Sequence, residues 1–179
     1  MMCFKMIIEG LYVFDLERNA DQRGYLAHTF DKLDMERLNI SFPISRVILS
    51  HNEKRGTLRG MHFQVGHASQ SKLVSVTRGS IWDAVVDLRP ESTTYRMIQF
   101  FELKANERMV HVPKGCAHGF ITLEDYTDVL YQMDGYYAKD FECGIRWDDP
   151  SFNIPWPTQP TVISDKDKSW SLFSDTVLS

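Results

Sequence analysis

The sequence has few of the features that mark special classes of protein. Its three cysteines, Cys3, Cys116 and Cys143, are widely spaced and form no CxxC pair, so neither a disulfide framework nor a thiolate zinc site is indicated. No apolar run approaches the roughly 20 residues that a membrane helix needs. The opening residues MMCFKMIIEGLYVFDLE lack the basic and then apolar layout of a signal peptide. We therefore expect a cytoplasmic protein.

Repeats, low-complexity runs and linkers are also lacking. The whole chain, residues 1–179, therefore suits a single domain that is long enough to bury a core. An excess of positive charge is absent as well, because the formal net charge is −4. This charge argues against a broad nucleic-acid surface, although local basic clusters would still hold a small anion. We expect neither a nucleic-acid partner nor a membrane partner.

Alternation of apolar and polar residues is the dominant pattern, and it predicts an all-β protein. KLVSVTRGSIWDAVVDLR (72–89) predicts two strands joined at Arg78-Gly79. Three further strands are predicted at 97–103, 108–113 and 127–133. The best helical candidate is DKLDMERLNI (31–40), and the Pro-rich tail from Asp148 is predicted to wrap the body as ordered loop and short helix. Many short strands separated by turn residues are typical of a β-sandwich or barrel.

Lys72 is predicted to face the interior, because it shares a strand face with two valines. If the two strands form a hairpin at residues 78–79, Lys72 lies opposite Val85, with Asp83 and Asp87 as its diagonal neighbours. An interior Lys beside an interior Asp is costly unless the two pair or serve a site. The pattern leaves two interpretations, a shielded salt bridge at a barrel mouth or a functional site.

A histidine interrupts the strand-like run TLRGMHFQ (57–64). His62 shares its face with Gly60, which leaves room in front of the ring for a ligand, and His118 follows the turn in VPKGCAHGF. Two such histidines favour either metal binding or acid–base chemistry in a metal-free pocket. The spacing weighs against metal, because the His-x-His pair typical of a barrel site is missing. Strict alternation points Arg59 away from His62, so either Gly60 carries a bulge that turns both inward, or Arg59 reaches a site at a subunit boundary.

Seven segments between residues 21 and 167 resemble, in order, the signature blocks of the dTDP-4-dehydrorhamnose 3,5-epimerase family, and the resemblance as a whole runs from about Ile8 to Asp167. One block alone is weak, whereas seven in the right order are highly specific for the family. The matching blocks are DQRGYLAHTF (21–30), GTLRGMHFQ (56–64), SKLVSVTRGSIWDAVVDLR (71–89), VPKGCAHGFITL (112–123), VLYQMDGYY (129–137), GIRWDDP (144–150) and ISDKD (163–167).

The resemblance implies a cupin-type jelly-roll barrel with a few short helices, usually a homodimer. Such a protein acts without metal or other cofactor on a nucleotide-linked 4-keto-6-deoxy sugar. The catalytic positions of the family fall on His62 as general base, Asp167 as its orienting carboxylate, Tyr131 as the acid on the opposite face of the ring, and Lys72, backed by Asp83, as the group that stabilises charge on the ketone oxygen. The positions that hold the sugar and the pyrophosphate fall on Arg59, His118, Lys166 and, from a partner subunit, Arg23.

These residue types suit the removal and return of a proton next to a ketone. Such a proton becomes removable if a preorganised cation meets the enolate oxygen. A histidine titrates near neutral pH, and a carboxylate on its far nitrogen fixes its tautomer. Inversion needs a second group on the other face of the ring, which the hydroxyl of Tyr131 would supply. Tyr137, beside Tyr136, suits either stacking on a nucleobase or sugar, or packing.

Two departures from the family pattern concern substrate recognition. The family often has Glu where this chain has His28, and VILSHNEKR (47–55) replaces the usual Gln-x-Asn-x-Ser-x-Ser run. The nucleotide (dTDP, CDP or GDP) and the inverted carbon (C3, C5 or both) therefore stay open. Two alternative hypotheses remain, a metal-dependent cupin enzyme built on His62 and His118, and a non-catalytic module that binds sugar nucleotides.

Overall fold

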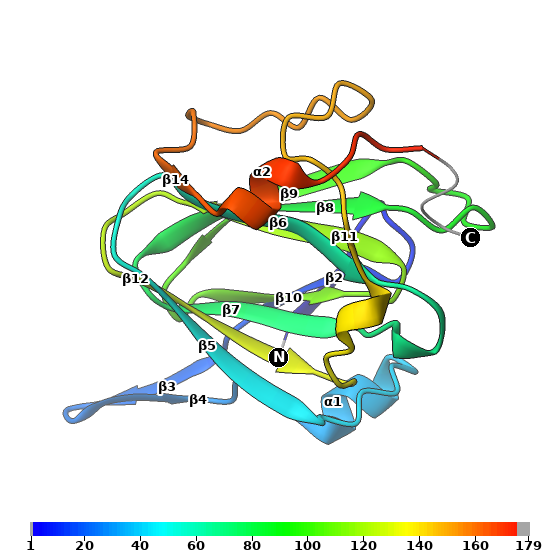
Figure 1. Cartoon of the computed structure of the whole chain (residues 1–179). Coiled ribbons are helices and arrows are strands. Elements are labelled where there is room, and N and C mark those ends of the chain that lie inside the picture. Colours follow the sequence, from blue (N-terminus) through cyan, green and yellow to red (C-terminus); the bar gives the residue numbers. More distant parts are fainter. Residues whose placement is uncertain (1, 175–179) are drawn as a thin grey trace.

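Two sheets face each other in the structure, a computed structural model that describes residues 2–174. The first sheet has the strand order β1-β2-β10-β7-β12-β5, and the second has the order β13-β6-β11-β8-β9, with β14 added beside β6 (Figure 1). The first sheet contains β1 (Met2–Lys5), β2 (Tyr12–Asp15), β5 (Arg46–Asn52), β7 (Lys72–Arg78), β10 (Arg108–Val112) and β12 (Thr127–Met133). The second contains β6 (Thr57–Gln64), β8 (Ser80–Asp87), β9 (Ile98–Lys104), β11 (Cys116–Thr122), β13 (Glu142–Gly144) and β14 (Val162–Ile163).

The main core lies between the two sheets, because alternate residues of their strands point inward. Val74 and Val76 of β7 are buried there against Val85 of β8 and Phe120 of β11. The inward face predicted for Lys72 is therefore confirmed, and so are the strands predicted at 97–103, 108–113 and 127–133. The expected all-β class is confirmed too.

The predicted hairpin between β7 and β8 is wrong. The two strands lie in different sheets, and the turn at Gly79, with φ +76°, carries the chain from one sheet to the other. Lys72 consequently faces β8 across the interior and is not its hydrogen-bonded neighbour. Asp87, expected beside Lys72, instead accepts hydrogen bonds from Arg89, Ser92 and Thr94 at 2.6–2.8 Å.

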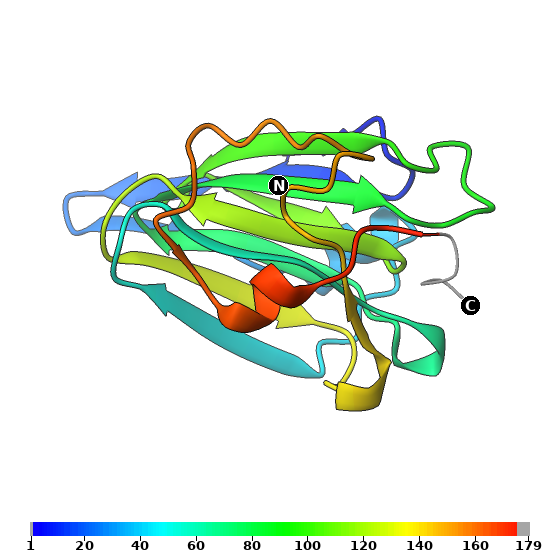
Figure 2. The same cartoon turned by 45° about the horizontal axis from the view of Figure 1, so that its top comes forward.

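The tail after residue 148 wraps the outer face of the second sheet, as predicted (Figures 1 and 2). Phe152 and Ile154 pack there against Met61 and Phe63 of β6 in a second apolar cluster. The chain then forms β14, which runs parallel to β6, and the short helix α2 (Asp165–Ser169). The tail thereby brings α2 against β6, the strand of His62.

The remaining elements are short and peripheral. The hairpin of β3 (Arg18–Asp21) and β4 (Gly24–Ala27) extends away from the barrel (Figure 1). The predicted helix is confirmed as α1 (Lys32–Arg37), which is shorter than expected and begins where the Asp31 side chain accepts the N–H of Leu33 at 2.8 Å. Two 3-10 helices span Gly66–Ala68 and Lys139–Phe141. Within the part of the chain that the structure describes, no helix is long and apolar enough to cross a membrane.

Candidate active site

A cavity of about 260 Å³ lies between the two sheets. Strands of both sheets contribute to its wall, since β5, β7 and β12 come from the first sheet and β6, β11 and β13 from the second. Six residues predicted from the sequence line it together, namely Arg59, His62, Lys72, His118, Tyr131 and Tyr137. Residues far apart in the chain are thus brought to one site.

A β-bulge at Gly60 explains how Arg59 and His62 reach the same cavity. In the pairing of β11 with β6, His118 lies opposite His62 and Phe120 lies opposite Arg59, so two residues of β6 face one of β11. Gly60 has φ +136°, and a Cβ there would lie 2.5 Å from the Cα of Gly119. Of the two alternatives left open by the sequence, the bulge is therefore the one observed.

His62 is held by Asp167, which the N-terminal turn of α2 presents to it. The Nε2 of His62 lies 2.6 Å from Oδ1 of Asp167, whose other oxygen accepts the N–H of Gly60 at 3.3 Å. Burial raises the pKa of Asp167, but the hydrogen bond and charge of His62 and the hydrogen bonds from Gly60 and Ser164 together outweigh burial, so the pKa lies below its usual range. An ionised carboxylate accepts only, so Nε2 carries the proton, and Nδ1 is left with a lone pair. That nitrogen has no hydrogen-bond partner among the described residues.

Lys72 and Asp83 lie inside the barrel, but they form no ion pair within the described part of the chain. Oδ1 of Asp83 instead contacts Nε2 of His118 at 2.7 Å, while its Oδ2 has no hydrogen-bond partner there. The shielded Lys72–Asp83 salt bridge considered from the sequence is therefore not formed, and Asp83 acts on Lys72 through space. Burial lowers the pKa of Lys72 to about 8 against the opposing attraction of Asp83. Burial also lowers the pKa of His118.

Tyr131 lies on the wall opposite His62, because β12 belongs to the first sheet and β6 to the second. Its ring meets the ring of His118 edge-on, with centroids 6.0 Å apart, and lies 6.5 Å from that of Phe120. Burial raises the pKa of Tyr131 far above its ordinary value. The phenol therefore stays protonated at neutral pH and is a donor of an O–H.

A carboxylate that the sequence analysis missed lies at the cavity mouth. Oε2 of Glu142 accepts the hydroxyl of Tyr137 at 2.6 Å, and Oε1 lies 2.5 Å from the ammonium of Lys166. Burial raises the pKa of Glu142, but the bonds from Lys166 and Tyr137 outweigh it and leave the pKa below its usual range. The residue stands two positions before the GIRWDDP block, outside every matched segment.

Strand β5, the segment that departs from the family pattern, forms one wall of the cavity. Antiparallel neighbours share a face, so Arg46, Met133 and Lys72 form one row across β5, β12 and β7. Ile48 and Tyr131 lie in the next row. Arg46, Ile48 and Gln70 were not singled out from the sequence, because composition alone did not show that their segments border the cavity.

Arg23, another predicted site residue, lies in the turn between β3 and β4. Its guanidinium, with 85% of the side chain exposed, pairs with Asp21 on the β3–β4 hairpin at 2.5 Å. It does not line the cavity of its own chain. His28, one of the departures from the family, lies 3.6 Å from Asp31 and does not line the cavity either.

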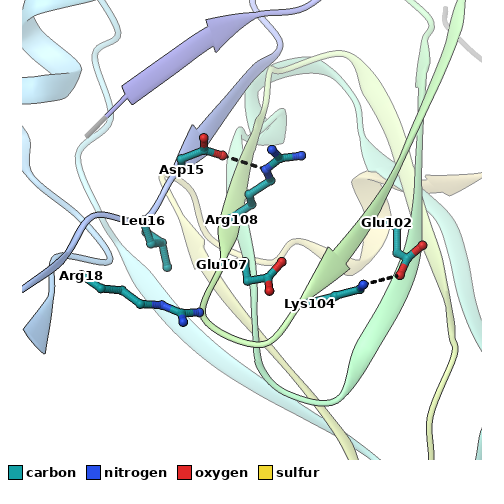
Figure 3. Close-up of a pocket in the computed structure, with 7 residues that line it drawn as sticks. All are labelled: Asp15, Leu16, Arg18, Glu102, Lys104, Glu107 and Arg108. Atoms are coloured by element: carbon teal, nitrogen blue, oxygen red, sulfur yellow. Dashed lines mark hydrogen bonds and ion pairs between the residues drawn. The ribbon is translucent and has the colours of Figure 1, made fainter. Parts of the chain in front are cut away.

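A second depression, of about 590 Å³, lies at a separate place beside β2, β9 and β10 (Figure 3). Four of its charged residues form two ion pairs, Asp15–Arg108 at 2.7 Å and Glu102–Lys104 at 3.3 Å. None of the predicted site residues lines it. Within residues 2–174, no three His, Cys, Asp or Glu side chains gather in a way that could hold a metal ion.

The jelly-roll barrel and the histidine, lysine and tyrosine around one cavity define an acid–base enzyme of the cupin type. The family model described as dTDP-4-dehydrorhamnose 3,5-epimerase matches residues 5–175. The chain belongs to the dTDP-4-dehydrorhamnose 3,5-epimerase family, and the resemblance noted from the sequence is confirmed. It is accordingly an isomerase.

Individual relatives agree with this assignment. The dTDP-4-dehydrorhamnose 3,5-epimerase of Escherichia coli (strain K12) is 35% identical over 164 residues, which cover 90% of this chain and 88% of the relative. A crystal structure of dTDP-4-dehydrorhamnose 3,5-epimerase from Bacillus anthracis, with TDP and PPi bound, has a TM-score of 0.93 and 35% identity and covers 96% of this chain and 99% of that chain. The dTDP-4-dehydrorhamnose 3-epimerase of Streptomyces niveus is 32% identical over 171 residues, covering 94% of this chain and 82% of the relative. The predicted jelly roll is thereby confirmed.

Proposed function

We propose that this protein is a single-domain epimerase that inverts carbon next to the ketone of a dTDP-linked 4-keto-6-deoxy sugar, for the synthesis of rhamnose or a related deoxysugar. One observation carries the proposal. His62 and Tyr131 come from opposite sheets and line one cavity, which Lys72 also lines. A base and an acid on opposite sides of a bound ring are what inversion requires. Family membership supports the choice of substrate.

His62 is the general base in this mechanism. Asp167 holds the protonated Nε2, so the lone pair on Nδ1 takes the proton from the carbon next to the ketone. The electrons of the broken C–H bond move to the ketone oxygen, where the ammonium of Lys72 stabilises the negative charge. Asp167, kept ionised, stabilises the imidazolium that forms.

Tyr131 is the acid that completes the inversion. Its hydroxyl, protonated at neutral pH, returns a proton to the same carbon from the opposite side of the sugar. The phenolate and the imidazolium then exchange protons with solvent, which restores the starting state. No net proton is consumed, so the reaction needs no oxidant or reductant.

The substrate contacts follow from the charges around the mouth. Arg59 and His118 line the cavity and suit the sugar and its phosphates, while Lys166 and Tyr137 lie at the rim. We further infer a homodimer that works in the cytoplasm, in which a partner subunit's Arg23 completes the diphosphate site. The extended β3–β4 hairpin and the exposure of Arg23 support this inference.

Solvent exchange tests the proposal. The protein is incubated in deuterated water with dTDP-, CDP- and GDP-linked 4-keto-6-deoxyglucose, and deuterium at the ring carbons is followed by NMR. We expect deuterium next to the ketone of the dTDP sugar, and no exchange in His62→Ala. The control is His67→Ala, which removes an exposed histidine outside the cavity. Absence of exchange with all three sugars in the unaltered protein would contradict an epimerase.

Inversion at C3 alone is the second candidate function, favoured by the similarity to the 3-epimerase of Streptomyces niveus. The same experiment distinguishes the two, since deuterium at C3 only supports single inversion and deuterium at C3 and C5 supports double inversion. Elemental analysis of the purified protein tests the metal-dependent cupin, which requires stoichiometric transition metal.

A further inference from the structure

The indole of Trp170, the residue directly after α2, lies against the imidazole of His62 from outside the cavity. The two ring centroids are 6.3 Å apart, and the ring planes meet edge to face at 66°. Aromatic rings attract one another in this arrangement. Trp170 is half-buried and does not line the cavity, so its contact is with the base and not with the space that a substrate would fill.

Gly144 makes room for this indole. Strand β13 pairs with β6 so that Gly144 lies directly opposite His62, and opposed residues share a face of the sheet. A Cβ at residue 144 would collide with Cε2, Cδ2 and Nε1 of Trp170. The missing side chain therefore lets the indole lie over the backbone of β13, at the flank of the imidazole.

The segment that presents Asp167 to His62 also carries Trp170. Asp167 is held in α2 by the hydroxyl of Ser164, which accepts its N–H at 3.0 Å, and Trp170 follows three residues later. The hydrogen bond from Nε2 to Asp167 fixes one point of the imidazole, but the second side-chain torsion of a histidine has a broad preference. With 33% of the His62 side chain exposed, core packing alone does not hold the plane of the ring.

We propose that Trp170 is a positioning residue, whose indole over Gly144 fixes the plane of the His62 imidazole so that Nδ1 points at the reacting carbon. This inference rests on the proposed function. Transfer of a proton from carbon requires the base to lie close to the C–H bond and in line with it, and a misplacement of about 1 Å costs up to about a hundredfold in rate. The contribution therefore falls on the chemical step and not on affinity.

Trp170→Ala tests the proposal through separate measurements of kcat and affinity. We expect kcat for deuterium exchange into the dTDP keto sugar to fall at least about tenfold, while the Kd for dTDP, measured by calorimetry, changes less than about twofold. Trp170→Phe keeps an aromatic ring at the flank of His62 and should restore kcat to within about threefold of the unaltered protein. Trp82→Ala is the matched control, because it removes another half-buried indole, stacked on Phe100 at 5.1 Å. It should lower the melting temperature and leave kcat unchanged.

Gly144→Ala provides a second variant that leaves Trp170 in the chain and displaces its indole. Its kcat should fall as in Trp170→Ala, and the double variant should be less than about twofold slower than Trp170→Ala, because the group that the new Cβ displaces is already gone. Additive losses in the double variant would overturn the proposal.

The ammonium of Lys166, which lies 5.5 Å from the indole centroid, supplies the competing explanation. A raised Kd with unchanged kcat in Trp170→Ala would assign the indole to Lys166 and overturn the positioning of His62. Unchanged kcat and Kd, while the unaltered protein exchanges deuterium, would overturn the positioning role alone. Absence of exchange in the unaltered protein with the dTDP, CDP and GDP sugars would overturn the proposed function as well.

Discussion

Lys72 is expected to set the basic limb of the pH profile of kcat/KM. Burial lowers its pKa to about 8, although the nearby charge of Asp83 opposes the shift. The ammonium, and not the neutral amine, stabilises negative charge on the ketone oxygen. Activity is therefore present below that pKa and is lost as the pH rises through it. At pH 9 about one tenth of Lys72 is protonated, so kcat/KM should fall about tenfold between pH 7 and pH 9.

Lys72→Arg isolates this group, because a guanidinium remains protonated above about pH 12. The variant should be slower, since its donor atoms are displaced, but its profile should have no limb near pH 8. Tyr131 does not interfere, because burial raises its pKa far above this window. Lys104→Arg, on the surface beside Glu102 (Figure 3), is the control and should keep the limb.

Initial rates of deuterium incorporation at subsaturating substrate, from pH 6 to pH 10.5, provide the measurement. The profile of kcat/KM reports groups of the free enzyme, which is the state described by the structure. A limb above pH 10 in the unaltered protein, or a limb near pH 8 that persists in Lys72→Arg, would show that Lys72 does not set the basic limb.

Three further predictions concern stability. Lys72→Met should abolish activity but raise the free energy of unfolding at pH 7 by about 3 kcal/mol, as measured by urea unfolding. The reason is that folding lowers the pKa of Lys72 from 10.5 to about 8, so below pH 8 the folded state disfavours the charged ammonium. A less stable variant would contradict this prediction. Gly60→Ala should lower the free energy of unfolding by about 2 kcal/mol or more and inactivate the enzyme, because the added Cβ would collide with Gly119. Gly24→Ala is the control: Gly24 also has a positive φ, but open space surrounds it, so thermal melts should show a smaller loss of stability. Asp87→Asn should lower the free energy of unfolding at pH 7 by about 2 kcal/mol. Burial raises the pKa of Asp87, but hydrogen bonds led by those from Arg89 lower it to about 2, so this stabilisation is present above pH 4 and is lost as the pH falls toward 2. The free energy of unfolding of the variant should therefore vary less over that range of pH.

Local patterns in the sequence predicted the elements well and their partners poorly. Alternation placed Lys72 on the inward face of its strand, and the helix predicted at 31–40 is present in shorter form as α1, with Asp31 as its N-cap. Alternation says which face of a strand is buried, but a turn such as Gly79 serves equally to form a hairpin or to cross between sheets. The wrong partner for β7 followed from this ambiguity.

The site, too, was predicted only in part, because local patterns do not show which distant segments of the chain meet. The geometry of Arg59 depends on the close approach of Gly60 to Gly119, which are far apart in sequence, so alternation could only pose the question. The partner of Asp83 proved to be His118, a diagonal neighbour on the adjacent strand. Glu142 gave no signal, because a single acid in a loop-rich segment resembles any solvated carboxylate.

Comparison of His62→Ala with Tyr131→Phe tests whether a base and an acid act from opposite sides of one sugar. Both variants are incubated with the dTDP keto sugar in deuterated water, and NMR follows both deuterium incorporation and ring configuration. We expect His62→Ala to lose exchange, whereas Tyr131→Phe retains exchange at the original configuration and loses inversion. Equal loss of exchange and inversion in both variants would contradict this expectation.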